Sequence, residues 1–273
     1  MKTPEQASDT SVMMTKVYDY YFSSAAYERR YPMPNRATLE FILGHGAREA
    51  GSILDFGCGN GRYAMALLQA CKARITGCDI SSASLDEFAR RLQHGGQAQR
   101  VELVHGPIDS LGAGRRFDSI LMMFGVLAHV GRRCERIRVL RGLRTMLEPG
   151  GRLVLSVPNV YRRRPGELLK TLAARVLSQH MPEQAEEPGD IYFTRSIADR
   201  NLTFFYHLYS VAGLRSELEE AGFCMTDCRA ESLLPEWLIT QHRAVAGFDR
   251  MVLPFLPATL GYGICASATA APA

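Results

Sequence analysis

The stretch Ser52–Gly61, SILDFGCGNG, determines the fold that the sequence predicts. Its apolar start is typical of a short buried strand, and three glycines at alternate positions then leave almost no side chain where the backbone must turn. Residues 62–72 follow as a predicted helix, whose free N-terminal amide groups favour a carboxylate or phosphate. Strand, glycine turn and helix together predict a nucleotide site at this point of the chain.

A second acid supports this interpretation. Asp79 ends the next apolar stretch, Arg74–Asp79, and an acid at about this distance from the glycines accepts both ribose hydroxyls of an adenosine in doubly wound folds. The acid before the first glycine, Asp55, distinguishes the motif from the GxGxxG pattern of dinucleotide enzymes. With both features in register, the sequence resembles the class I S-adenosylmethionine (SAM) methyltransferases. In that family the DxGCGxG loop lies under the methionine part of SAM and the later acid holds the ribose.

The resemblance implies an α/β fold with a Rossmann-like, doubly wound, seven-stranded sheet and a final antiparallel strand. It also implies an N-terminal helical lid (1–46), a SAM-binding core (47–158), a cap insertion (159–209) and a C-terminal part of the core (210–273). The residues expected to bind SAM follow the first, second, third and fourth strands: Asp55, Gly57, Cys58, Gly59, Gly61, Asp79, Ile80, Ile108, Asp109 and Phe124.

The third strand departs from the family pattern. An aspartate that accepts the adenine amino group usually follows the glycine, whereas this chain has Gly106, Pro107 and Ile108. Proline offers neither a backbone N–H nor a side-chain acceptor. Either Asp109 takes over the adenine contact, or Ile108 holds the ring through its amide and apolar packing.

Periodicity and turn residues predict the remaining elements. Helices are expected over 12–31, 36–46 with Asn35 as cap, 81–93, 132–146, 166–177 and 214–221, and strands over 101–104, 117–124, 152–158, 223–229 and 262–268. Residues after 237 are interpreted as a loop that leads to the last strand.

The acceptor-binding residues are expected around this core. His129 follows the fourth strand at the ligand-bearing edge of a parallel sheet, where it is either a structural residue or a general base. The N-terminal segment is dense in tyrosine, either as a core-facing stripe or as a lid, and Tyr18 and Tyr27 are its candidate contacts. The cap adds Asn159 and Tyr206 as candidate substrate contacts and His207 as a second candidate base.

Composition limits the alternatives. The chain has 273 residues, 47% of them hydrophobic, and a net charge of +4. Its cationic side chains are nearly all arginine. Its seven cysteines show neither a CxxC pair nor regular spacing, so no metal site and no disulfide framework are predicted, and a cytoplasmic location is expected. Pro254, Pro257, Gly261 and Gly263 interrupt the one apolar stretch long enough to suggest a membrane span.

Three functions remain open from the sequence. The first is a SAM-dependent methyltransferase that acts on an oxygen or nitrogen of a small-molecule acceptor. The second is a tRNA methyltransferase, because Arg30–Pro34, Gly57–Tyr63 and Phe205–Tyr209 resemble stretches of the tRNA wobble-uridine carboxymethyl methyltransferases. The third is a SAM-binding partner protein without catalysis, which the altered Pro107 position favours. The acidic residues Glu183, Glu186, Glu187 and Asp190 of the cap argue against binding of phosphates.

Overall fold

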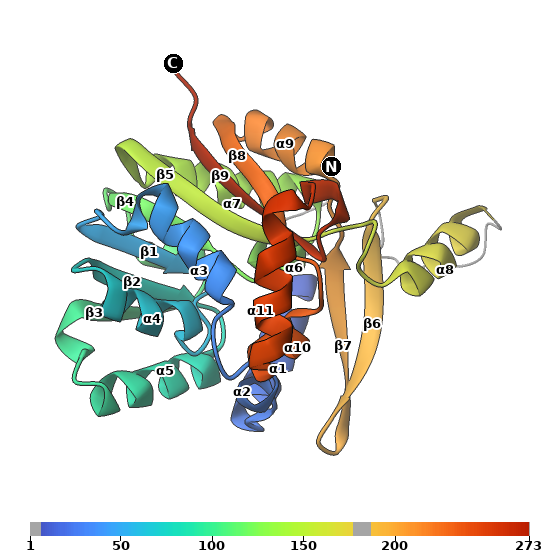
Figure 1. Cartoon of the computed structure of the whole chain (residues 1–273), viewed down its shortest axis with the longest axis horizontal. Helices are drawn as coiled ribbons and strands as arrows, with labels where there is room; N and C mark the ends of the chain where they lie inside the picture. The colour runs from blue at the N-terminus through green and yellow to red at the C-terminus, as the bar shows by residue number, and fades with distance from the viewer. Residues whose placement is uncertain (1–6, 177–186, 273) are drawn as a thin grey trace.

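A twisted sheet forms the centre of the computed structural model, which describes residues 7–176 and 187–272. Within these residues the sheet has seven strands in the order β3-β2-β1-β4-β5-β9-β8 (Figure 1). They are β1 (Ser52–Phe56), β2 (Arg74–Asp79), β3 (Val101–His105), β4 (Phe117–Met122), β5 (Leu147–Pro158), β8 (Phe223–Ser232) and β9 (Gly263–Ala270). β9 runs antiparallel to both β5 and β8, and the other pairs are parallel. The predicted fold class is confirmed.

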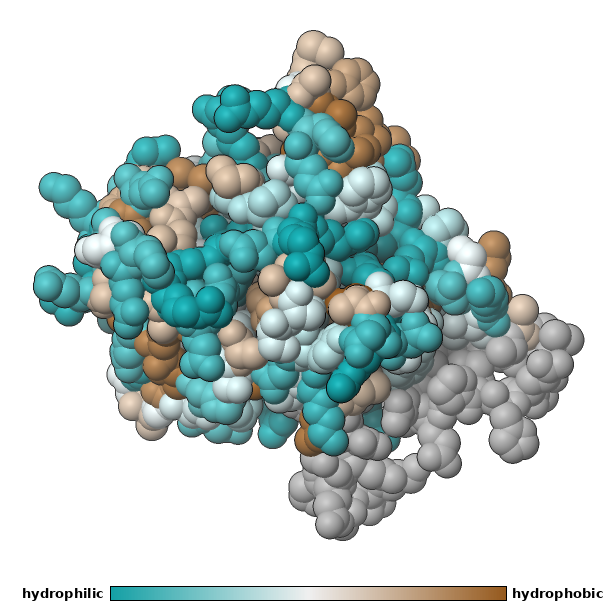
Figure 2. Space-filling model, turned by 90° about the horizontal axis from the view of Figure 1, so that it is seen from below, coloured by the Kyte–Doolittle hydropathy of each residue, from teal (hydrophilic) through white to brown (hydrophobic). Residues whose placement is uncertain are grey.

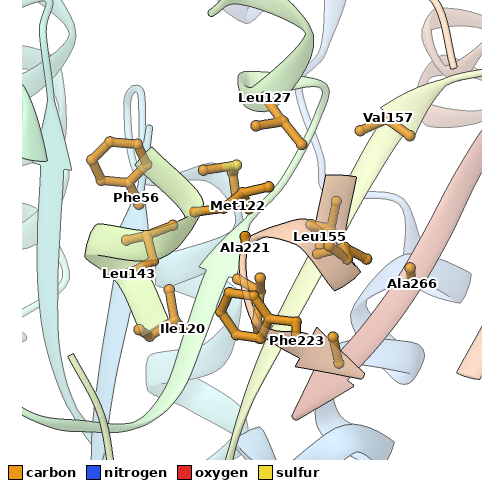
Figure 3. Close-up of a cluster of buried hydrophobic side chains, with 14 of the residues drawn as sticks. Phe56, Ile120, Met122, Leu127, Leu143, Leu155, Val157, Ala221, Phe223 and Ala266 are labelled. Atoms are coloured by element: carbon orange, nitrogen blue, oxygen red, sulfur yellow. The ribbon is translucent and has the colours of Figure 1, made fainter. Parts of the chain in front are cut away.

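Helices cover both faces of the sheet. In Figure 1, α3 (Arg36–Ile42) and α4 (Arg62–Ala70) lie in front of it, with α5 (Ser82–His94) on the same side, and α7 (Arg133–Thr145) lies behind. Successive strand residues alternate between the two layers: Ile53 packs with Leu67 and Phe88, whereas Leu54 packs with Leu140 and Leu143. The second layer also receives α9 (Val211–Glu220), next to Phe223 (Figure 3). This alternation explains why the central strands are apolar along their whole length.

The N-terminal segment forms two helices where one was predicted. α1 (Ala7–Ser23) and α2 (Ala26–Arg30) are separated at Ala25, whose φ of 53° is left-handed. Asn35 caps α3 as predicted, because its side chain accepts a hydrogen bond from the backbone N–H of Ala37. A π-helical turn (Leu43–Ala47) then leads to β1.

The cap contains a helix and a β-hairpin. α8 (Pro165–Val176) is followed by β6 (Asp190–Ile197) and β7 (Arg200–His207), which pair antiparallel outside the main sheet. The hairpin was not predicted, and Glu183, Glu186 and the predicted helix end at 177 lie outside the described residues. Hairpin rings such as Phe204 pack against Met14 and Tyr21 of α1, so the N-terminal helix and the cap share one apolar cluster.

The prediction of a loop after residue 237 was wrong. The chain there forms α10 (Glu236–Gln241) and α11 (Arg243–Val252), followed by short 3-10 turns at Leu253–Phe255 and Ala258–Leu260. α11 is anchored by a polar residue: the buried Asp249 carboxylate accepts hydrogen bonds from the backbone N–H groups of Leu233 and Leu234. Its large apolar side chains Phe248 and Met251 are exposed, so apolar residues do not mark the inward face of this helix.

Shorter elements complete the described chain, namely α6 (Val126–His129) and 3-10 turns at Ala98–Arg100 and Ile108–Leu111. Among the helices of residues 7–176 and 187–272, none combines the length and apolar character that a bilayer-spanning segment needs. The described part of the face in Figure 2 is mostly hydrophilic, with small, separate hydrophobic patches.

Gly61 provides a test of how strictly the glycine turn is required. It has φ 73°, and a Cβ atom there would overlap the ring of Phe88, which is fully buried and cannot move aside. We expect Gly61→Ala to lower the free energy of unfolding by about 3 kcal/mol, from left-handed strain and overpacking together. Gly96 has φ 64°, but a Cβ atom there would meet no other atom within 4 Å. Gly96→Ala should therefore lower the free energy of unfolding by only about 1 kcal/mol. Equal losses in urea unfolding would contradict this explanation.

Candidate active site

A pocket opens at the carboxyl ends of β1, β2 and β4, where a parallel sheet binds its ligands. One side is formed by the glycine loop, Asp79 and Ile80, and one end by Pro107–Asp109. The N-terminal helices contribute Tyr18 and Tyr27 from above. His129 and residues that follow it, up to Val139 of α7, also line the pocket. The pocket therefore brings together the N-terminal helices, the glycine loop and the end of the fourth strand.

Asp79 joins the second strand to the glycine loop. Its Oδ2 accepts a hydrogen bond from the backbone N–H of Gly59 at 2.7 Å, and its Oδ1 accepts one from Ser81 at 2.9 Å. Burial raises the pKa of Asp79 above its usual value, although the hydrogen bonds from Ser81 and Gly59 act in the opposite direction. The carboxylate thus lies at the pocket wall and fixes the loop on which a ligand would rest.

Asp55 is a second buried acid in the same wall. Burial, together with the neighbouring Asp79 carboxylate, raises the pKa of Asp55 to about 7, although Arg62 lowers it. Burial and the repulsion between two neighbouring carboxylates both favour the protonated form, so Asp55 keeps its proton over much of the range in which an ordinary aspartate is ionised.

The adenine end retains both alternatives of the sequence analysis. Ile108 is buried and Asp109 is exposed, and both line the pocket beside Pro107. Ile80 and Phe124 also line it, and Phe124 has a left-handed φ of 61°. The assignment of the adenine contact stays a prediction.

His129 is held between α1, which lines the pocket, and β7, which does not. Its Nδ1 lies 2.9 Å from the carbonyl oxygen of Phe205 in β7, and its Nε2 lies 2.6 Å from the hydroxyl of Tyr18 in α1. Because a carbonyl only accepts, Nδ1 carries the proton and Nε2 accepts from Tyr18. Burial lowers the pKa of His129 to about 3, although the Phe205 carbonyl acts in the other direction. The imidazole is therefore neutral and a weak base.

Four of the predicted residues do not line this pocket. His207 binds Asp190 through Nδ1 at 2.7 Å and packs against Tyr209, so its position does not support the expected role as a general base. Asn159 donates from Nδ2 to backbone carbonyls at 258, 259 and 261, which makes it a structural cross-link. Tyr206 packs on His129 with ring centroids 4.5 Å apart but does not line the pocket. Gly61 likewise contributes to packing, beside Phe88.

His207 belongs to a buried charge cluster under the cap. Glu187, His207 and Glu217 each contribute a side-chain oxygen or nitrogen atom that could bind a metal ion, and these three atoms lie within 4.8 Å of one another. Arg136 already supplies a cation there, with Nη2 2.7 Å from Glu187 and 2.6 Å from Glu217. The cluster is therefore an ion-pair network between α7, α9 and the cap.

Several pocket residues were not singled out from the sequence. Arg62, directly after the last glycine, is the most consequential, and others are Met14, Phe22, Met123, Val126, Glu135 and Arg138. The signal for Arg62 was available, since a cation that opens the helix after the glycine loop must lie near the ligand.

An open α/β sheet with a glycine loop and an acid on the next strand defines a nucleotide-binding protein of the Rossmann-like class. Residues 53–151 match the family model described as a methyltransferase domain. A protein of Encephalitozoon cuniculi that carries the name methyltransferase is 30% identical over 205 residues, which cover 75% of this chain and 82% of the relative. The chain therefore belongs to the class I SAM-dependent methyltransferases, whose cofactor is SAM.

Other relatives are similar over a smaller share of their length. The tRNA U34 carboxymethyltransferase of Klebsiella pneumoniae is 30% identical over 214 residues, 75% of this chain and 55% of the relative. The cypemycin N-terminal methyltransferase of Streptomyces is 29% identical over 136 residues, 49% of this chain and 54% of the relative. The chain thus spans about half the length of these relatives.

Solved structures agree with the fold. The 1,6-didemethyltoxoflavin-N1-methyltransferase of Burkholderia thailandensis, solved with 1,6-didemethyltoxoflavin and S-adenosylhomocysteine, superposes with a TM-score of 0.59. The match covers 100% of this chain and 92% of that chain at 18% identity, so it shows a common fold alone.

The raised pKa of Asp55 predicts a pH-dependent stability. Between about pH 4 and pH 7 the unfolded chain has released this proton while the folded chain retains it, so the free energy of unfolding falls as pH rises, by up to about 4 kcal/mol. Asp55→Asn removes this titration. In urea unfolding without ligand, the free energy of unfolding of the variant minus that of the wild type should therefore rise from pH 4 to pH 8.

Asp118 provides the matched control. Burial raises the pKa of Asp118, but hydrogen bonds from Ser52 and Gly51 outweigh this effect and lower the pKa overall. Asp118 therefore titrates below the range from pH 5 to pH 8. The difference between Asp118→Asn and the wild type should stay constant from pH 5 to pH 8. A constant difference for Asp55→Asn as well would contradict the assignment.

Proposed function

We propose that this protein is a SAM-dependent methyltransferase that transfers a methyl group to an oxygen or nitrogen atom of an enclosed small-molecule acceptor. The observation that carries the proposal is the pocket in which the glycine loop and Asp79 face the Tyr18–His129 pair. SAM supplies a methyl group on a sulfonium leaving group, so the protein's task is to align the reactants and exclude water.

The residues present fit this cofactor. Backbone without side chains at the glycine loop leaves room for a ligand, and Asp79 offers acceptor atoms to ribose hydroxyls. Ile80 and Ile108 offer apolar contacts to adenine, and Asp109 offers an acceptor for its amino group. We assign these residues, with Asp55, Cys58 and Phe124, to the cofactor half of the pocket.

Tyr18 and His129 belong to the acceptor half. Because the Tyr18 hydroxyl donates to Nε2 of His129, its oxygen lone pairs remain able to accept a hydrogen bond from an O–H or N–H group of the acceptor. A histidine with so low a pKa is poorly suited to remove a proton, so its role is to orient Tyr18. We infer that the pair positions the acceptor, with Tyr27 as a further wall of the pocket.

Among the described residues, the pocket wall includes the lid but none of residues 159–209, so the cap acts by supporting the lid. α1 and the hairpin share one apolar cluster above the pocket, and His129 is bonded to both. We therefore retain 1–46 as a lid and 159–209 as a cap around a core formed by 47–158 and 210–273. Enclosure on this scale suits a small acceptor better than a macromolecule.

The second candidate function, methylation of tRNA, is favoured by the similarity to tRNA U34 carboxymethyltransferase. The arginines that a phosphate backbone would need are largely engaged within the fold. Arg162 donates to the carbonyls of Leu233 and Leu260, and Arg164 lies 3.5 Å above the ring of Phe193. On α7, Arg133 pairs with Glu220.

The acidic residues of the cap give less support than expected. Glu187 pairs with Arg136, and Asp190 binds His207, so neither is available to repel a phosphate at the surface. The preference for a small molecule rests on the enclosed pocket and the engaged arginines.

Removal of the ribose acid tests the cofactor assignment. Asp79→Ala should weaken the binding of S-adenosylhomocysteine more than tenfold, since hydrogen bonds to a charged group contribute about 1.5 to 3 kcal/mol. Asp86→Ala, at an exposed position of α5, is the matched control and should bind like the wild type. Calorimetry that finds the same affinity in both variants would remove Asp79 from the site.

The acceptor class is tested by supplying radiolabelled SAM with either a metabolite extract or bulk tRNA. We expect label in small molecules, with a rate that changes little between low and moderate salt. Transfer to tRNA, falling steeply with salt and abolished by replacing Arg162, Arg163 and Arg164, would establish the RNA function instead. Binding of SAM with no turnover of either pool would favour a partner protein without catalysis.

A further inference from the structure

The helix α11 presents its large apolar side chains to solvent. Phe248 and Met251 are 51% and 66% exposed, and Phe255, in the 3-10 turn that follows the helix, is 85% exposed. Residues three apart lie on the same side of a helix, so Phe248 and Met251 share one side of α11. In Figure 1 this helix lies in front of the sheet. Its outward side is therefore its apolar side.

The inward side of α11 is held by a polar residue. The buried carboxylate of Asp249 accepts hydrogen bonds from the backbone N–H groups of Leu233 and Leu234. A helix that only had to pack on the core of the protein would turn its apolar side inward. The observed orientation leaves the apolar side of α11 available to a partner.

The adjoining helix adds a further apolar side chain to the same part of the surface. α10 packs against α11, and its Trp237 is exposed. Four of the ten large apolar side chains that are exposed within the described residues thus lie in the short segment 237–255. Single exposed apolar side chains are common on soluble proteins, whereas a group of them from one segment marks an interaction site. We call the exposed side chains of residues 237–255 the docking surface.

The exposed charge of the docking surface is positive. Arg243 and Arg250 are exposed, whereas Glu236 and Asp249, the only acids between residues 233 and 262, are buried. Arg250 pairs with Glu40 of α3, but Glu40 is shared with a second arginine of that helix. The partner of this surface should therefore combine an apolar phase with negative charge.

A second copy of the chain does not have this combination. In a two-fold dimer the same surface meets itself, so Arg243 and Arg250 would face cations, and the segment exposes no acid to pair with them. A bilayer with anionic lipids offers negative headgroups to the arginines and an acyl boundary to the apolar side chains. An exposed tryptophan such as Trp237 is suited to that boundary, because its ring is amphipathic.

We propose that the docking surface binds a bilayer that contains anionic phospholipids. Phe248, Met251 and Phe255 enter the boundary between headgroups and acyl chains, and Arg243 and Arg250 contact the headgroups. The attachment is peripheral, since no helix among the described residues is long and apolar enough to cross a membrane. It depends on neither the cofactor nor the acceptor, so its failure would leave the proposed function untouched.

Trp237 reports directly on this attachment, because it is the only tryptophan of the chain. The full chain is titrated with vesicles of three parts phosphatidylcholine and one part phosphatidylglycerol. The emission of Trp237 should shift to shorter wavelength and should be quenched when the lipids carry bromine on their acyl chains. Vesicles of phosphatidylcholine alone should bind at least tenfold more weakly, since each arginine near an anionic surface contributes about a factor of five.

Removal of the apolar side chains tests which face inserts. Phe248→Ser combined with Met251→Ser should weaken co-sedimentation with the anionic vesicles at least tenfold, because less apolar surface enters the acyl boundary. Leu169→Ser combined with Leu172→Ser is the matched control on α8, where the two side chains are 66% and 41% exposed. This control should bind like the wild type. Thermal unfolding establishes that both variants are folded.

Removal of one cation tests the contribution of charge. Arg243→Gln should weaken binding to the anionic vesicles about fivefold and leave binding to phosphatidylcholine vesicles unchanged. Arg90→Gln, at an exposed position of α5, is the matched control and should change neither.

Four results would overturn the proposal in distinguishable ways. Absence of binding to the anionic vesicles rules out a bilayer as the partner. Binding without quenching of Trp237 by brominated lipid means that another face is attached, and equal losses in the α8 control mean adsorption without a defined face. A dimer in sedimentation equilibrium that the substitutions at Phe248 and Met251 dissociate would assign the docking surface to a second copy of the chain.

Discussion

The sharp turn between β1 and α4 is the constraint on which the rest of the structure depends. Gly57 has φ 75°, and a Cβ atom there would overlap the side chain of Val126 in α6, just as one at Gly61 would overlap Phe88 in α5. The absence of these side chains allows both helices to approach the loop closely. It also allows the backbone N–H of Gly59 to reach the Asp79 carboxylate at 2.7 Å. The turn therefore determines both how the helices pack and where the proposed cofactor contacts lie.

The packing of the hairpin on α1 depends on a second set of interactions, which join segments distant in sequence. The buried Arg136 of α7 pairs with Glu217 of α9 and with Glu187 before the hairpin, and the Tyr209 hydroxyl donates to Glu217. A buried network of this kind is not strong evidence for stability, but loss of one member leaves an uncompensated charge, which constrains the geometry. The hairpin that it anchors then packs its rings on α1. Neither segment could bury this apolar surface alone, and His129 is hydrogen-bonded to both of them, to α1 and to β7.

Much of this architecture could be predicted from the sequence, because apolar runs bounded by glycine or charge are local signals. The strand Arg74–Asp79 was predicted at its observed bounds. α11 was missed because it is anchored by the buried carboxylate of Asp249 and not by an inward apolar face. The roles expected for His129 and His207 could not be separated, since which imidazole lines the pocket depends on contacts between distant segments, such as that of His207 with Asp190. Arg62 was overlooked because the glycines before it explain the turn without any role for the first side chain of the helix.

The arginine content shows why position matters more than net charge. The chain has a charge of +4, which by itself suggests an anionic partner. Many of its guanidinium groups instead join distant parts of the backbone, as Arg100 does by donating to the carbonyls of Leu68, Cys71 and Ala73. Five donors on a planar group make arginine suited to such cross-links. A cation whose donors are satisfied within the fold contributes little to recognition of a phosphate backbone. By this criterion the net charge of the chain is not an argument for an extended phosphate backbone as its partner.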